Sequence, residues 1–256
     1  MNNNLFLDGI KNLIHVSLAE PGMQDETITL KMFDDLSRKM TTDLHEEQFS
    51  SFLKERKIKY LVHFTHIDNL KHILKIGLIP REYLEEELIR ITLRPRFSDN
   101  QRLDGNKKVN CLSVSFPNYQ MFYTKSMDKQ DEWAVILFDL NIIKEHRCEF
   151  TSKNSASKDS KPIEGIEGAE QMFADLDLRE RLGLPSYYTT NPQAEVLEYS
   201  VVPHLWIKEV HLYSNKHMNK VAKWKKSENT IIKVDRNYFR PREDYGHWSG
   251  GSQRSQ

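Results

Sequence analysis

The residues that most suggest chemistry are four polar side chains between residues 60 and 70. They are His63, Thr65, His66 and Asn69. They lie where an apolar stretch that favours a strand, residues 60–64, passes into a short helical pattern. Backbone N–H groups at a helix N-terminus lack partners and attract anions, so this junction suits a phosphate-bearing ligand. The same side chains could instead only cap the helix and shape the turn, and this segment alone leaves both interpretations open.

The stretch after this junction predicts one short amphipathic helix. Its apolar face consists of Leu70, Ile73, Leu74 and Ile76. We expect Asp68 to be its N-cap and Gly77 to end it in a left-handed conformation. Pro80 then prevents the helix from resuming. This strand, turn and helix would hold the four polar side chains at one edge of a sheet.

The composition excludes several classes of protein. The chain has 256 residues, of which 38% are hydrophobic and 29% charged, and it has no run near the ~20 apolar residues of a membrane span. No basic segment followed by an apolar one opens the chain, so we expect no secretory signal and a cytoplasmic protein. Cys111 and Cys148 are too few for a thiolate zinc site or a disulfide framework. His204 and His211 lack partners at metal-ligand spacing, so we expect no metal.

The charge balance differs between the two ends of the chain. Residues 1–55 contain five Lys/Arg and ten Asp/Glu, a balance of −5, whereas residues 205–248 contain ten and five, a balance of +5. In the C-terminal segment the cations alternate with aromatic residues, which suits single-stranded nucleic acid through phosphate pairing and base stacking. The alternative is that these aromatic side chains pack on the core and leave only a solvated basic face.

The order of predicted elements favours an α+β fold. Residues 1–56 read as helices packed on the core, residues 57–248 as the main domain, and residues 249–256 as a disordered tail. Phe49, Phe52 and Leu53 recur at a helical spacing that is typical of core contacts. Strands are predicted at 109–116, 133–140, 193–202 and 206–213, separated by long loops at 92–110 and 151–168. No Gly-x-Gly-x-x-Gly or Walker loop is present, so a nucleotide would bind to another architecture.

Three separated motifs join into one constellation. The first is His63-Phe-Thr-His with Asn69, Gly77 and Leu78, the second is Arg102, and the third is Asn191-Pro-Gln-Ala-Glu195. Together they resemble the DarT family of DNA ADP-ribosyltransferase toxins over roughly residues 57–213. The resemblance implies an ADP-ribosyltransferase fold, in which two facing β-sheets form a cleft for NAD. It also implies transfer of ADP-ribose from NAD to a base in single-stranded DNA, with release of nicotinamide.

The resemblance also implies a role for each matching residue. Glu195 corresponds to the catalytic glutamate and Arg102 to the family arginine, although Arg94 or Arg96 of the same loop could serve instead. The expected NAD-binding residues are His63, Phe64, Thr65, Asn69, Gly77, Leu78, Met121 and Tyr123. A carboxylate suits this reaction independently, because cleavage of the ribose–nicotinamide bond builds positive charge on the ribose. Without the motif, Glu195 would be taken for an ordinary surface carboxylate, which is what we expect Glu198 to be.

The target base is left open between guanine and thymine, with guanine favoured. Gln193 precedes Glu195 on the same expected face of a strand and could contact a base edge while the glutamate activates the base nitrogen. Two alternatives remain: the same fold acting on RNA or protein, and a nucleic-acid-binding module without activity. The resemblance further implies a partner antitoxin that removes ADP-ribose or blocks the cleft.

Overall fold

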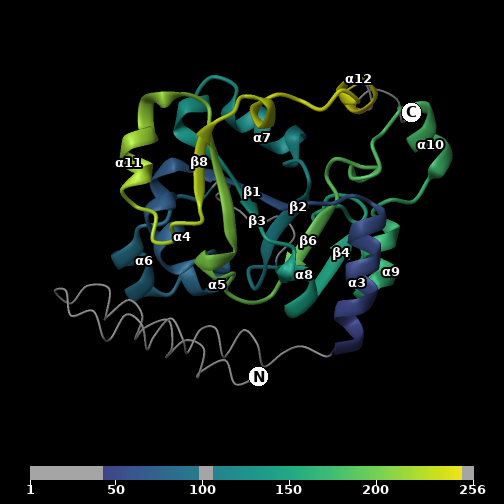
Figure 1. Ribbon diagram of the computed structural model, residues 1–256, viewed down its shortest axis with the longest axis horizontal. Helices are drawn as coiled ribbons and strands as arrows, with labels where there is room; N and C mark the ends of the chain where they lie inside the picture. The colour runs from purple at the N-terminus through teal and green to yellow at the C-terminus, as the bar shows by residue number, and fades with distance from the viewer. Residues whose placement is uncertain (1–42, 98–105, 250–256) are drawn as a thin grey trace.

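The computed structural model describes residues 43–97 and 106–249 (Figure 1). Their strands form an eight-stranded sheet in the order β5-β4-β6-β2-β1-β3-β7-β8. The strands are β1 (Leu61–His66), β2 (Asn110–Val114), β3 (Trp133–Phe138), β4 (Cys148–Thr151), β5 (Ile163–Glu164), β6 (Glu195–Glu198), β7 (Ile207–Leu212) and β8 (Ile231–Val234). Strand β8 pairs in parallel with β7, and the other pairings are antiparallel.

Short helices surround the sheet. They are α3 (Asp43–Glu55), α4 (Leu70–Ile76), α5 (Arg81–Leu84), α6 (Glu87–Leu93), α7 (Tyr119–Ser126), α8 (Asn141–Glu145), α9 (Gly165–Gln171), α10 (Leu176–Arg181), α11 (Met218–Ala222) and α12 (Tyr245–Ser249). The described residues also contain five 3-10 turns: η1 (Ile67–Asn69), η2 (Gln130–Glu132), η3 (His204–Trp206), η4 (Asn215–His217) and η5 (Asn237–Phe239). Figure 1 shows α4, α6 and α11 gathered at the β8 end of the sheet and α3 and α9 at the β4 end. This mixture confirms the α+β class.

We expected two facing sheets, but in the described residues the strands form one continuous hydrogen-bonded sheet. The link is short, because β1 and β2 pair only at Leu61 with Val114 and at Val62 with Ser113. Beyond Val62 the two strands separate, and His63 spans the gap by donating from Nδ1 to the carbonyl oxygen of Cys111 at 3.1 Å. A cavity can therefore open between two strands of the same sheet.

Strand β3 is buried on both faces, which explains its continuous apolar sequence. Successive side chains point to opposite faces, so Ala134, Ile136 and Phe138 enter the main core. Val135 and Leu137 enter a second cluster that includes Phe239. Phe239 and its neighbour Tyr238 pack on the sheet in this way, which confirms core packing for these two aromatic residues of the C-terminal segment.

The described part of the N-terminal segment contributes to the main core. Phe49 is fully buried and its ring stacks on Phe150 with centroids 5.7 Å apart, and Phe52 contacts the ring of Phe173 at 5.6 Å. The core assignment of Phe49, Phe52 and Leu53 is therefore confirmed. Residues 1–42 and the tail beyond residue 249 lie outside the described residues, so the proposed domain limits stay a prediction.

Two local predictions need correction. Residues 151–168 are not a single loop, because Ile163 pairs with Phe150 to form β5, and α9 begins at Gly165. Asp68 is not the N-cap, because the turn η1 intervenes and the His66 side chain accepts from the Asp68 N–H. Gly77 does end α4, as predicted, but its φ of 101° and ψ of −178° are extended and not the left-handed helical conformation that we expected. Within residues 43–97 and 106–249, no helix is long and apolar enough to cross a membrane.

Candidate functional site

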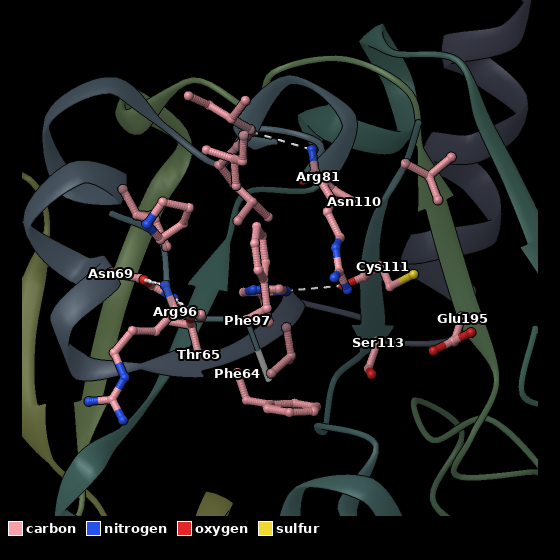
Figure 2. A pocket seen from close by; sticks show the side chains of 18 of the residues that line it. Phe64, Thr65, Asn69, Arg81, Arg96, Phe97, Asn110, Cys111, Ser113 and Glu195 are labelled. Carbon is pink, nitrogen blue, oxygen red and sulfur yellow. Dashed lines mark hydrogen bonds between the residues drawn. The ribbon is translucent and has the colours of Figure 1, made fainter. Parts of the chain in front are cut away.

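A cavity of about 250 Å³ opens where β1 and β2 separate (Figure 2). Its walls come from distant parts of the sequence: β1 with α4, the segment 93–97 after α6, strand β2, residues 154–156, and the start of β6. Figure 2 shows Glu195 on the opposite side of the cavity from Thr65 and Asn69, with Phe97 between them. Most of this surface is apolar, so the few polar groups that face it determine what can bind.

The first wall is fastened by the side chain of Asn69. Its Nδ2 donates to Thr65 Oγ1 at 3.0 Å and to the carbonyl oxygen of Arg96 at 2.7 Å, while its Oδ1 accepts from the Arg96 N–H at 2.8 Å. The guanidinium of Arg96 donates to Asp68 at 2.9 Å, and this hydrogen bond holds the pKa of Asp68 below its usual value. Asn69 thus ties segment 94–97 to the end of β1.

Phe97 is held over the cavity by a cation–π contact. The guanidinium carbon of Arg81 lies 4.3 Å from the centre of the Phe97 ring. Arg81 also donates to Glu85 at 2.7 Å, and Lys107 donates to the second oxygen of that carboxylate at 2.6 Å. These hydrogen bonds hold the pKa of Glu85 below its usual value. The stack gives this wall an aromatic face suited to a planar ring.

The second wall contains Glu195, the first residue of β6. The residue is only 9% exposed, and its Oε2 accepts from the Ser155 N–H at 3.0 Å. Its own N–H donates to Thr151 Oγ1 at 3.3 Å on the neighbouring strand β4. The Glu195 carboxylate therefore lines the cavity, is largely shielded from bulk solvent, and is held in position by the hydrogen bond from Ser155.

Glu198 is not a surface carboxylate, which corrects the sequence-based interpretation. It is fully buried, and it accepts from Asn110 Nδ2 at 2.9 Å and from the Ser200 N–H at 2.5 Å. Its Oε1 also lies 2.8 Å from His146 Nδ1. These contacts join β6 to β2, so Glu198 stabilises the strand that carries Glu195 and does not face the cavity.

Most of the predicted site residues do meet in this cavity. Those that line it are His63, Phe64, Thr65, Asn69, Gly77, Leu78, Met121 and Glu195. Two others do not. Tyr123 lies on α7 beside Tyr245, and Gln193 lies before β6, in the turn where its N–H donates to Asn191 Oδ1 at 2.8 Å. Arg102 lies outside the described residues.

Sequence reasoning missed several lining residues. Phe97, Asn110 and Asn118 all face the cavity. The signal for Phe97 was present, because it is the only aromatic residue between positions 92 and 110. Asn110 and Asn118 gave no such signal, since their positions depend on how β2 and α7 pack. Residues 43–97 and 106–249 contain no cluster of three His, Cys, Asp or Glu suited to a metal ion.

The cavity also contains a histidine with an altered pKa. His72 lines it from α4. Burial lowers the pKa of His72 below 6.5, and the nearby charges of Lys71 and Lys75 lower that pKa further. A neutral imidazole therefore faces the cavity at neutral pH.

Comparison with known protein families shows to which family a chain with this cavity belongs. A family model described as "ssDNA thymidine ADP-ribosyltransferase, DarT" matches residues 62–240, which include all but the first residue of β1, the residues that line the cavity and Glu195. The chain belongs to the DarT family. DarT enzymes are NAD-dependent ADP-ribosyltransferases that act on single-stranded DNA, and this membership confirms the resemblance carried by the three motifs. No curated protein sequence matches the chain.

Solved DarT structures share the fold. Thermosipho africanus DarTG in complex with ADP-ribose superposes with a TM-score of 0.55 at 18% identity, over 71% of this chain and 51% of that one. This chain therefore spans about half the length of that relative. Thermus sp. 2.9 DarT in complex with carba-NAD+ gives 0.51 at 17% identity, over 72% and 99%. The same Thermus protein with ADP-ribosylated ssDNA gives 0.51 at 16%, over 72% and 97%. At these identities the likeness establishes the fold.

Proposed function

We propose that the chain uses this cavity to transfer ADP-ribose from NAD to a thymine base in single-stranded DNA, with Glu195 as the catalytic carboxylate. The observation that carries the proposal is the placement of Glu195. It faces the same cavity as His63 and Thr65, although these residues lie more than 120 positions apart in the sequence. Membership of the DarT family and the complexes of its solved relatives with NAD+ and ADP-ribosylated ssDNA support the choice of substrates.

The proposed reaction breaks the bond between the nicotinamide nitrogen and C1′ of its ribose. The bonding electrons leave with nicotinamide, and C1′ gains oxocarbenium character that the Glu195 carboxylate stabilises. A nitrogen of the DNA base then bonds to C1′ and loses its proton, for which Glu195 is the nearby acceptor. His63 contributes position, since its hydrogen bond to the Cys111 carbonyl holds the ring at the cavity wall. Arg102, as the family arginine that is expected to contact phosphate or to help the transfer, is part of the same proposal.

The choice of base departs from the preference for guanine that the sequence suggested. That preference depended in part on Gln193, and Gln193 is not among the residues that line the cavity. The description of the matching family names thymidine. Thymine is therefore the base we propose, and guanine is the alternative that the experiment must separate from it.

The test is mass spectrometry of single-stranded oligonucleotides incubated with the protein and NAD. One oligonucleotide contains every base, a second lacks thymine and a third lacks guanine, and RNA and an unrelated protein form two further arms. We expect a mass increase of one ADP-ribose on the first and third oligonucleotides only. Modification of the second oligonucleotide in place of the third would assign guanine, and modification of RNA or protein alone would reject DNA as the substrate.

Two glutamate variants separate the role of Glu195 from a general loss of charge. Glu195→Gln keeps the shape of the side chain and removes the carboxylate, so we expect a loss of transfer of at least about a hundredfold. Glu164→Gln is the matched control, because Glu164 is exposed on β5, away from the cavity. Equal activity of Glu195→Gln and the wild type would reject the proposed catalytic role.

The proposal extends to a toxin controlled by an antitoxin. The relative from Thermosipho africanus is named DarTG, and this chain spans about half of it. A partner that removes ADP-ribose from DNA or blocks the cleft is therefore proposed for this chain also. Both substrates are present in the cytoplasm, where we place the protein. Growth arrest on expression of the wild type, absent for Glu195→Gln, would support the toxin.

A further inference from the structure

A loop that leads to Glu195 is fixed by a buried arginine of α10. This loop, residues 185–190, ends five residues before Glu195. Arg179 is 7% exposed, and its guanidinium donates to the carbonyl oxygens of Tyr188 at 2.6 Å and Pro185 at 3.0 Å. It also donates to Thr190 Oγ1 at 3.3 Å. One planar fork therefore restrains three points of the same loop.

A second buried arginine holds the loop from the C-terminal segment. Arg242 forms a bidentate ion pair with Asp244, in which Nε donates to Oδ1 at 2.9 Å and Nη2 donates to Oδ2 at 2.5 Å. Its remaining nitrogen donates to the carbonyl oxygen of Thr189 at 3.1 Å. Arg242 is 4% exposed and Asp244 is 6% exposed. Trp248 of α12 donates to the same carboxylate at 2.8 Å, which ties the C-terminal helix to this pair.

The two clamps present one exposed aromatic side chain. The Arg242 guanidinium carbon lies 4.7 Å from the centre of the Tyr188 ring, and Phe116 contacts the same ring edge-on at 5.8 Å. Tyr187 packs against this fixed ring at 4.9 Å and is itself 38% exposed. An aromatic surface on a rigid support can stack on a base with little loss of conformational entropy.

We propose that Arg242, paired with Asp244, is a positioning residue that fixes loop 185–190 so that Tyr187 stacks on a base of the single-stranded DNA substrate. The inference rests on the proposed function, and it adds a residue to it, since Arg242 lies beyond residues 62–240 of the family match. The loop continues directly into the site: Thr189 Oγ1 donates to the Asn191 carbonyl oxygen at 2.8 Å, four residues before Glu195.

The chemistry of the clamp fits positioning better than stability alone. A buried ion pair contributes little net stability compared with apolar residues of similar size, because both charges must leave water. The fork instead fixes direction, because it binds Asp244 with two nitrogens and the loop with the third. Lysine has a single ammonium group, so it can keep the charge but not this geometry.

The test compares kinetics of the full chain with NAD and an oligonucleotide as separately varied substrates. For Tyr187→Leu we expect the KM of the oligonucleotide to rise about tenfold, as loss of one base stack predicts. For Arg242→Lys we expect a rise of several fold. In both variants the KM of NAD should stay within twofold of the wild type. Tyr187→Phe keeps the ring and should behave as the wild type does.

Arg181→Lys is the matched control for Arg242→Lys, because Arg181 is an exposed arginine on α10 and its charge is also kept. An unchanged oligonucleotide KM in Tyr187→Leu overturns the proposal. So does an Arg242→Lys variant in which only the fraction of folded protein falls, or in which the KM values of NAD and the oligonucleotide rise equally. These failures differ from failure of the proposed function, in which the wild type itself modifies no DNA.

Discussion

The two walls of the cavity are built in opposite ways. The wall formed by β1 and α4 is mainly local: Asn69 bonds to Thr65 four residues away, and the helix ends on its own Gly77. The loop before Glu195 has distant partners. The Thr190 N–H donates to the Met172 carbonyl oxygen, and Ser186 Oγ donates to the Arg56 carbonyl oxygen.

This difference shows which part of a site can change without loss of the fold. A local wall is specified by one short motif, so a change within that motif damages both wall and core. A loop held by side chains from elsewhere in the chain can shift while the sheet stays intact. We therefore expect substitutions in the first wall to affect mainly stability and NAD, and those around the loop to affect mainly the DNA substrate.

The largest effect is expected for Gly77→Ala in the first wall. The residue has a φ of 101°, and an added Cβ would lie 2.1 Å from the carbonyl oxygen of Val202. We expect a loss of about 3 kcal/mol or more in the free energy of unfolding, measured with urea. Gly183→Ala is the control, because Gly183 also has a positive φ of 59° but has open space around it. A similar loss in both variants would show that strain, not the contact with Val202, limits this position.

A smaller loss is expected for Arg179→Lys beside the second wall. The lysine cannot reach the carbonyl oxygens of both Pro185 and Tyr188, so about 2 kcal/mol of unfolding free energy should be lost. Because the loop shifts, the oligonucleotide KM should rise more than the NAD KM. An equal rise in both would contradict the division between the two walls.

The local wall could be predicted from the sequence for a physical reason. All four residues of the apolar face of α4 are buried, and Gly77 ends the helix, because a 3.6-residue period and a glycine act over a few residues. The family motif then placed Glu195 in the cavity. The error at Asp68 is also local, since His66 offers a ring nitrogen to the same N–H.

The second wall could not be predicted in this way. Arg242 read as part of a solvated basic segment, yet it is 4% exposed, because besides its pair with Asp244 it donates to the carbonyl oxygen of Thr189, 53 residues away in the sequence. Glu198 read as a surface residue for the same reason, since Asn110 and His146 lie 88 and 52 residues away in the sequence. The pattern of charged residues in a sequence predicts exposure for an unpaired charge, but the fold decides which charges are paired.

Asn69→Asp should have a moderate effect confined to the first wall. The aspartate can still accept from the Arg96 N–H, but it cannot donate to the Arg96 carbonyl oxygen or to Thr65. We expect a loss of about 1 to 2 kcal/mol in stability and a rise of several fold in the KM of NAD, with the oligonucleotide KM nearly unchanged. Asn229→Asp, at an exposed position, controls for the added charge. A change in the oligonucleotide KM alone would place Asn69 with the DNA substrate.

The smallest effect is the pH dependence that His72 gives to the first wall. Its folded pKa lies below 6.5, because burial and the charges of Lys71 and Lys75 disfavour the imidazolium. As the pH falls through 6.5, the unfolded chain gains a proton at this residue before the folded chain does, so stability decreases toward acid. His72→Gln cannot titrate and should remove this part of the decrease, roughly 1 kcal/mol or less. Urea unfolding of both proteins between about pH 7.5 and 5.5 measures it. Asp68 and Glu85, whose pKa values are also lowered, lose their contributions only below 3.8 and 4.5. Burial lowers the pKa of His211 as well, but His211 is present in both proteins, so its contribution cancels in the comparison. Parallel pH profiles for the two proteins would mean that His72 is hydrated in the folded chain, and that the cavity wall beside α4 is open to water.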